Sequence, residues 1–112
     1  MSRRRPWEVW FAYVYYEDMP AEGKRRPVVI LDDDMLCVTS AMVTTHKPRS
    51  FDYLDYELRF WKEAGLSCPS VVRLEHLRYL NNADFDTRIG RLQLGDISAI
   101  QQKLGSRMHT FR

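Results

Sequence analysis

Runs of β-branched and aromatic residues, separated by turn-forming residues, occupy most of the chain up to residue 92. This pattern predicts strands over residues 7–15, 27–31, 35–46, 53–58, 71–75 and 89–92. The connection at 32–34 is too short for a crossover helix, so the strands should follow one another as an antiparallel meander. We expect a loop over 59–66 with Trp61 packed inward, and a turn or single helical turn over 81–85.

The hydrophobic period changes near the C-terminus. Ile97, Ile100 and Leu104 recur at the spacing of one helix face, and Asp96 before them is a candidate N-cap. The strands and this helix predict a mainly β, α+β fold, in which a small antiparallel SH3-like barrel carries a C-terminal helix. A chain of 112 residues has the size of a single domain, so we expect one domain over 1–112 with flexible tails at 1–5 and 106–112.

The charges of the chain are segregated along the sequence. A net charge of +2 is too small to mark a general binder of nucleic acid. Basic residues gather at 3–5, 24–26 and 73–91, whereas acidic residues gather at 32–34 and 52–57. This distribution suits a local groove for an anionic substrate, although each basic run by itself is also typical of a solvated surface.

Neither a metal site nor a membrane segment is expected. Cys37 and Cys68 are too few and too far apart for a zinc site, and we expect both to be small buried side chains in a reducing cytoplasm. No stretch has the character of a signal peptide or of a transmembrane helix. The sequence therefore predicts a cytoplasmic protein without a membrane partner.

The strand predicted over 71–75 carries the most informative charges. Arg73 and Glu75 lie two residues apart in an apolar run, so their side chains share one face of the strand. A base beside a cation suits the cleavage of a phosphodiester. A surface ion pair explains the same two residues without catalysis, and the strand alone favours the ion pair, so support for catalysis has to come from the rest of the chain.

Two other stretches place polar groups at the ends of predicted strands. Residues 24–26 form a basic turn that holds Arg26 at the mouth of the second strand. In the strand over 35–46, Thr44 and His46 share one face, so a hydroxyl and an imidazole should meet at its C-terminal end.

In this order, and followed by Ile89-Gly90-Arg91-Leu92 before the terminal helix, these stretches resemble the MazF/PemK family of toxin endoribonucleases. In that family an Arg-Pro turn opens the second strand, a hydrophobic residue followed by threonine ends the third, and a later strand carries Ser-Val-Val with a carboxylate shortly after it. The corresponding segments here are Arg26-Pro27, Val43-Thr44 and Ser70-Val71-Val72 with Glu75, and the resemblance extends over about residues 6–104. It implies a CcdB/MazF-like fold, a homodimer and a cognate antitoxin protein as partner.

The resemblance also implies an activity. Such a protein is a metal-independent endoribonuclease without a cofactor, which inhibits growth by cleaving single-stranded RNA such as mRNA at selected sequences, through attack by the 2′-hydroxyl. The catalytic residues that it implies are Arg26, Thr44, Arg73 and Glu75. Glu75 would act as the base, the two arginines would bind phosphate, and Thr44 would donate a hydrogen bond to it. The expected RNA-binding residues are Lys24, Arg25, His46 and Arg78, and His46 is also a candidate proton donor.

Two other functions stay open at this point. The CcdB branch of the same fold poisons DNA gyrase by binding, and an RNA-binding module without activity would keep the same basic groups. The four implied catalytic residues favour cleavage, because a gyrase binder does not need them. The loop over 16–22 departs from the pattern of the family, so the analogy does not extend to the cleavage sequence.

Overall fold

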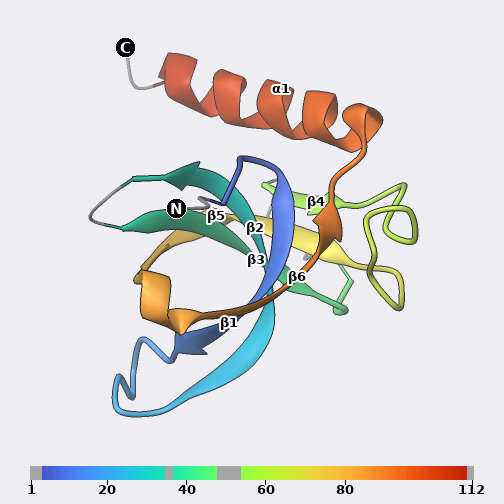
Figure 1. The fold of residues 1–112 in the computed structure, drawn as a ribbon. Coiled ribbons are helices and arrows are strands. Elements are labelled where there is room, and N and C mark those ends of the chain that lie inside the picture. Colours follow the sequence, from blue (N-terminus) through green and yellow to red (C-terminus); the bar gives the residue numbers. More distant parts are fainter. Residues whose placement is uncertain (1–3, 35–36, 48–53, 111–112) are drawn as a thin grey trace.

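Six strands and one α-helix make up the part of the chain that the computed structural model describes, residues 4–34, 37–47 and 54–110 (Figure 1). The elements are β1 (Glu8–Tyr15), β2 (Gly23–Asp33), β3 (Val38–Thr44), β4 (Asp55–Glu57), β5 (Val71–Leu80), the 3₁₀ turn η1 (Asn82–Asp84), β6 (Phe85–Arg91) and α1 (Leu94–Thr110). All strands pair antiparallel in one sheet with the order β4-β5-β3-β2-β1-β6. The predicted meander is confirmed for β1 to β3, and β6 returns to pair with β1.

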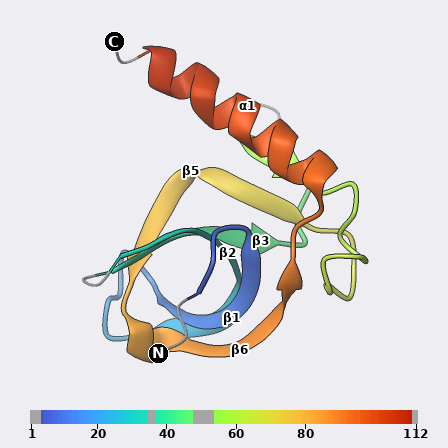
Figure 2. The same cartoon turned by 45° about the horizontal axis from the view of Figure 1, so that its top comes forward.

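The sheet is strongly curled. In Figure 2, β1, β2, β3, β5 and β6 run around a common interior, while α1 lies outside it near β4 and β5. Arg78 on β5 donates a hydrogen bond of 2.6 Å to the backbone oxygen of Tyr15 on β1, although two strands separate β5 from β1 in the sheet. The edge strands β4 and β6 do not pair with each other, so the sheet is not closed. The predicted fold class is confirmed, with an open, curled sheet in place of a closed barrel.

Both faces of the sheet are apolar, which explains the nearly continuous apolar runs in its central strands. One cluster contains Val29 of β2 and is covered by Ile97 and Ile100 of α1, the helix residues that the sequence pattern places on one face. The second cluster contains Val28 and Ile30, which alternate with Val29 along β2. The central strand β2 therefore buries side chains on both faces, and Val28, Val29 and Ile30 are all fully buried.

Several strands differ in length from the sequence prediction. β2 begins at Gly23 rather than at Pro27, because residues 23–26 pair with the second half of β1. β3 ends at Thr44, and His46 lies in a bend beyond it, so the prediction that His46 belongs to this strand is wrong. The predicted bounds at residues 35 and 53 lie outside the described residues. Pairing with a neighbouring strand determines where each strand begins and ends, and this pairing cannot be predicted from the apolar pattern of one strand alone.

The start of α1 also corrects the sequence prediction. The helix begins at Leu94, and the backbone oxygen of Gln93 accepts hydrogen bonds of 3.0 Å from the N–H groups of both Asp96 and Ile97. Asp96 is therefore inside the first turn, and its assignment as the N-cap is wrong.

The carboxylate of Asp96 instead anchors the loop that follows β4. It is fully buried and accepts hydrogen bonds from the Tyr56 hydroxyl (2.6 Å) and from the backbone N–H groups of Arg59 (3.1 Å) and Phe60 (3.0 Å). Buried backbone donors need an acceptor, and a carboxylate can serve several donors at once. Asp96 thus joins α1 to the segment that leads into the loop before β5.

Two smaller expectations have different outcomes. Trp61 packs against the first cluster, as predicted for the loop at 59–66. Cys37 and Cys68 are free thiols that are half-buried rather than buried, because both lie outside the strands. In the described part of the chain, no helix is long and apolar enough to cross a membrane.

Candidate functional site

Strand register brings Arg26, Thr44 and Arg73 to one face of the sheet. Met42 on β3 lies opposite Val28 on β2 and opposite Arg73 on β5. Side chains repeat every two residues along a strand, so Arg26 and Thr44 neighbour each other one step beyond the Val28–Met42 pair. Only β3 separates Arg26 from Arg73, and Arg26 lies two residues further along the sheet, which puts their backbones about 12 Å apart. Two guanidinium groups at this spacing can approach one phosphate from opposite sides.

Arg26 has hydrogen-bond donors to spare. Its side chain is half-buried, and its Nη1 atom lies 3.9 Å from the sulfur of Met42, a weak contact. Its Nε atom is buried without a hydrogen-bond partner among the described residues. Buried donors are rarely left unpaired in folded proteins. The guanidinium of Arg26 is therefore suited to receive an anion.

Thr44 ends β3 with its hydroxyl already partly oriented. The hydroxyl oxygen accepts a hydrogen bond of 3.2 Å from the backbone N–H of His46. A hydroxyl has one hydrogen to donate and two lone pairs to accept, so this bond leaves the hydrogen of Thr44 available. The His46 side chain is exposed beside it, in the bend after the strand.

Arg73 and Glu75 flank Leu74, which is buried in the first cluster, so both point away from that cluster. Both side chains are half-buried. The register of β5 is irregular at this point, because residues 74–77 lie opposite one residue of β3, Ala41. Such a bulge changes the direction of side chains. Glu75 therefore continues the row of Arg73, but at a position that strand alternation alone does not fix.

Asp55 is a carboxylate at this site that the sequence did not single out. It lies in β4 directly opposite Arg73, and its side chain is only 6% exposed. In the sequence it looks like an outward-facing strand residue, and only the β4–β5 pairing brings it to the arginine. Within the described residues, no group of three His, Cys, Asp or Glu side chains could hold a metal ion.

The basic turn divides between the two faces of the sheet. Lys24 is exposed on the face of Arg26. Arg25 lies on the opposite face, where its Nε is 2.6 Å from the Asp86 carboxylate and its guanidinium carbon is 3.9 Å from the centre of the Phe11 ring. The hydrogen bond from Arg25 lowers the pKa of Asp86. Of these two predicted RNA-binding residues, only Lys24 accompanies Arg26.

Arg78 is engaged in holding strands together. Besides its hydrogen bond to the Tyr15 backbone, it lies 3.9 Å from the Glu17 carboxylate, and its side chain is only 19% exposed. It is opposite Ser40, at the end of β3 away from Thr44. The structure thus separates Arg78 from the cluster that Arg26, Thr44 and Arg73 form.

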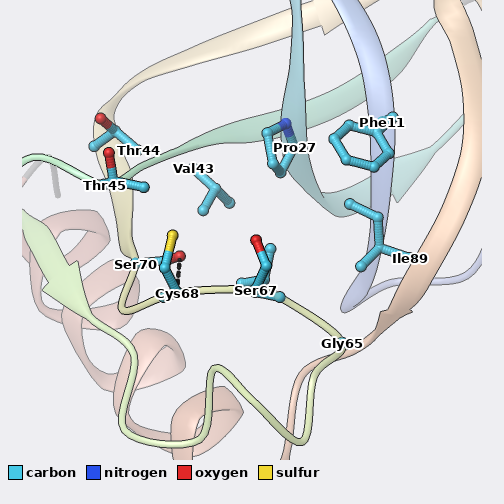
Figure 3. A pocket seen from close by; sticks show the side chains of 11 residues that line it. Phe11, Pro27, Val43, Thr44, Thr45, Gly65, Ser67, Cys68, Ser70 and Ile89 are labelled. Carbon is cyan, nitrogen blue, oxygen red and sulfur yellow. Dashed lines mark hydrogen bonds between the residues drawn. The ribbon is translucent and has the colours of Figure 1, made fainter.

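A pocket of about 360 Å³ opens beside Thr44 (Figure 3). Phe11 and Ile89 lie on one side of it, Thr44 and Thr45 on the other, and Cys68 of the loop before β5 lies between them. The sequence gives no sign of this pocket, because residues 65–69 carry no motif and become a wall only when the loop folds against β3 and β6.

Two glycines determine how closely that loop approaches β6. Gly65 has a φ of +97°, and a Cβ there would lie 2.6 Å from the backbone oxygen of Ile89. A Cβ at Gly90 would collide with the backbone oxygen of Ala64. The Ile89-Gly90 pair in the sequence therefore has a physical reason, since only glycine permits this contact.

A model of the family described as PemK-like, MazF-like toxin of type II toxin–antitoxin system matches residues 5–107. The chain belongs to this family. The match includes every strand, the basic turn and most of α1. Family membership confirms the resemblance to MazF and PemK toxins that the Arg-Pro, Val-Thr and Ser-Val-Val segments carry.

Solved structures of MazF proteins have a similar fold. The Mycobacterium tuberculosis toxin MazF-mt6 is 26% identical with a TM-score of 0.68, over 94% of this chain and 97% of that one. MazE-MazF (Form-II) from Deinococcus radiodurans is 16% identical with a TM-score of 0.65, over 96% of this chain and 97% of that one. Comparison with curated protein sequences gives no significant match.

Proposed function

We propose that this MazF/PemK-family protein is a sequence-selective, metal-independent endoribonuclease that cleaves single-stranded RNA. The observation that carries the proposal is the convergence of Arg26, Thr44 and Arg73 on one face of the sheet, with Glu75 next in the row. Cations and a hydroxyl donor gathered around a carboxylate suit an anionic substrate that is activated by loss of a proton.

The 2′-hydroxyl of RNA is an internal nucleophile, so the protein does not have to supply one. Glu75 removes the proton of the 2′-hydroxyl, the 2′-oxygen attacks phosphorus, and the bond from phosphorus to the 5′-oxygen breaks. The leaving 5′-oxygen takes a proton, and His46, exposed beside Thr44, is the candidate donor. The products are a 2′,3′-cyclic phosphate and a 5′-hydroxyl.

Arg26 and Arg73 stabilise the charge that develops on the phosphoryl oxygens. Arginine keeps its proton in proteins, so its contribution is electrostatic and through hydrogen bonds rather than by proton transfer. Thr44 donates its free hydroxyl hydrogen to the same phosphate, because its acceptor side is occupied by the His46 backbone. Lys24 extends the positive surface toward neighbouring phosphates.

We further propose a homodimer and an antitoxin protein as partners. Around the end of β1, Tyr13, Tyr15, Tyr16 and Met19 are between 36% and 50% exposed, which is a large apolar surface for one small domain. A second copy that covers this surface would account for the excess of aromatics in β1. Membership in a type II toxin–antitoxin family supports the antitoxin. Its action on mRNA would place the protein in the cytoplasm.

The test is incubation of the purified protein with a long single-stranded RNA, followed by mapping of the cut ends. Cleavage at a restricted set of sequences, with cyclic phosphate ends, is expected. Binding of RNA without cleavage would leave an RNA-binding module. Inhibition of DNA gyrase without RNA cleavage would transfer the protein to the CcdB type of function.

Neighbouring arginines offer a matched pair of variants. Arg26→Ala should lower kcat roughly 10²-fold or more, because it removes charge stabilisation from the transition state. Arg25 lies on the other face and is already paired with Asp86, so Arg25→Ala should lower kcat by less than a tenth of that factor, that is, by less than about tenfold. Equal losses in the two variants would remove Arg26 from the proposed mechanism. Circular dichroism checks that both variants fold.

A further inference from the structure

Met42 lies between the two arginines of the proposed site. It is on β3, directly opposite Arg73 of β5 and Val28 of β2. Arg26 is the neighbour of Val28 along β2 on the same face. The sulfur of Met42 is 3.9 Å from the Nη1 atom of Arg26. A change in the chemistry of this sulfur would therefore act directly on the proposed phosphate-binding groups.

The contact between Met42 and Arg26 is weak as it stands. A thioether sulfur is a poor acceptor, whereas a guanidinium has several N–H donors to satisfy. The Nε atom of Arg26 is buried without a hydrogen-bond partner among the described residues. Arg26 thus lies beside an acceptor that hardly engages it, and its donors stay available to an anion.

Met42 is open to a small oxidant. Its side chain is half-buried and packs against the second cluster, and Thr44 and Arg73 beside it are half-buried as well. A surface that RNA can reach can also be reached by hydrogen peroxide. Peroxide transfers one oxygen atom to a thioether: the S–O bond forms, the O–O bond breaks, the sulfur loses two electrons, and the other oxygen leaves as water.

Oxidation would give Arg26 a much better partner. An oxygen bonded to a sulfur that is 3.9 Å from Nη1 lies within hydrogen-bond reach of the guanidinium. A sulfoxide oxygen is polar, and hydrogen bonds from charged donors are stronger than those from neutral donors. Such a bond would turn the guanidinium toward Met42 and occupy donors that otherwise bind phosphate.

We propose that Met42 is a site of reversible oxidation, at which methionine sulfoxide binds the Arg26 guanidinium and inhibits binding of the RNA phosphate. The inference rests on the proposed endoribonuclease function and adds a regulation to the same site. Methionine sulfoxide reductases reverse the change: two thiols form a disulfide, the sulfur regains two electrons, and the oxygen leaves as water. Met42 therefore acts through Arg26 and takes no part in the reaction itself.

Met42→Leu is the matched control, because leucine has a similar volume and no sulfur. The variant keeps the other four of the five methionines and both cysteines, so peroxide modifies the rest of the chain equally. Wild type and variant are treated with hydrogen peroxide, which is then removed, and dithiothreitol reverses sulfenic acids and disulfides. Peptide mass spectrometry measures the sulfoxide at Met42. Each protein is compared with its own untreated sample.

Binding is measured by fluorescence anisotropy, with a single-stranded RNA that carries a 2′-deoxy nucleotide at the mapped cut and so lacks the nucleophile. Oxidation should raise the Kd of the wild type by about tenfold and that of Met42→Leu by less than about twofold. Methionine sulfoxide reductases of both epimer specificities, supplied with thiol, should restore the wild-type Kd. In Arg26→Ala, oxidation should also change the Kd by less than about twofold, because the partner of the sulfoxide is absent.

Three results would overturn the inference. The first is an equal loss of binding in the oxidised wild type and the oxidised Met42→Leu variant. The second is a tenfold loss in oxidised Arg26→Ala. The third is a Met42 that stays unoxidised when Met19, which is 50% exposed, is fully converted.

A measurement without RNA separates this inference from the proposed function. The Nε–H signal of Arg26 in the ¹⁵N NMR spectrum is assigned by its absence in Arg26→Ala. It should shift when the wild type is oxidised and stay in place when Met42→Leu is oxidised. A protein that shows this shift but cleaves no RNA refutes the proposed function and retains the contact. A protein that cleaves RNA but shows no shift keeps the function and refutes the inference.

Discussion

Replacement of Asp96 tests whether one buried carboxylate holds the C-terminal helix to the loop that walls the pocket. Asp96→Ala removes the acceptor for the Tyr56 hydroxyl and for the backbone N–H groups of Arg59 and Phe60. Within the described residues, Asp96 is the hydrogen-bond acceptor for all three of these donors. The variant should therefore lose both the attachment of the loop and part of the stability of the fold.

The magnitude follows from the three hydrogen bonds. Each donor that loses a charged acceptor costs about 1–3 kcal/mol when it stays buried, and less where water can replace the acceptor. Arg59 and Phe60 are exposed residues, so water can reach their N–H groups after a small opening of the loop. Three bonds at the lower value give a loss of about 3 kcal/mol in the free energy of unfolding. For a domain of this size that corresponds to a fall of about 12 °C in Tm.

Urea unfolding followed by circular dichroism is the direct measurement. With an m-value of about 2 kcal/mol/M, the midpoint should fall by about 1.5 M. Asp86→Ala is the matched control, since Asp86 is an exposed carboxylate with one arginine partner, and its midpoint should not move measurably. A shift for Asp96→Ala no larger than that of the control would refute the reasoning, because the buried bonds would then contribute nothing net.

Four further outcomes follow from the structure. Arg73→Ala and Glu75→Gln should each lower RNA cleavage roughly 10²-fold with little change in Tm, and the double variant should lose much less than the product; single variants that cleave normally would return the pair to a surface role. Cleavage should continue in EDTA, and an absolute need for Mg²⁺ would contradict the mechanism. Gly65→Ala should destabilise by about 2 kcal/mol, whereas Gly105→Ala, with open space around its Cβ, should not destabilise; equal Tm values would contradict the strain argument. Burial raises the pKa of Tyr56, and so do the hydrogen bond to the Asp96 carboxylate and its charge. The free energy of unfolding should therefore be at its full value below about pH 10 and fall above it. Unfolding measured between about pH 9 and 11 should show a steeper fall for the wild type than for Tyr56→Phe.

The sequence by itself determined the class of the fold. Alternating apolar runs with short turns require paired strands, and a helical period after residue 96 requires one terminal helix that packs through Ile97 and Ile100. The family resemblance was also contained in local segments, since Arg26-Pro27, Val43-Thr44 and Ser70-Val71-Val72 are each contiguous in the chain. Properties that depend only on residues close together in the chain, such as strand alternation or a contiguous motif, can be predicted from the sequence of that segment.

Tertiary structure decided which of the charged residues belong together. In the sequence Arg25 and Arg26 belong to one basic turn. In the structure, alternation along β2 places their side chains on opposite faces of the sheet, where Arg25 pairs with Asp86 and Arg26 neighbours Thr44. Aspartate is a residue type common at helix N-caps, yet the carboxylate of Asp96 accepts hydrogen bonds from backbone N–H groups of the loop after β4. The pocket, likewise, exists only because the loop at 65–70 lies against β3 and β6. Pairing register, bulges and loop packing are contacts between residues far apart in the chain, and no periodicity within one segment encodes them.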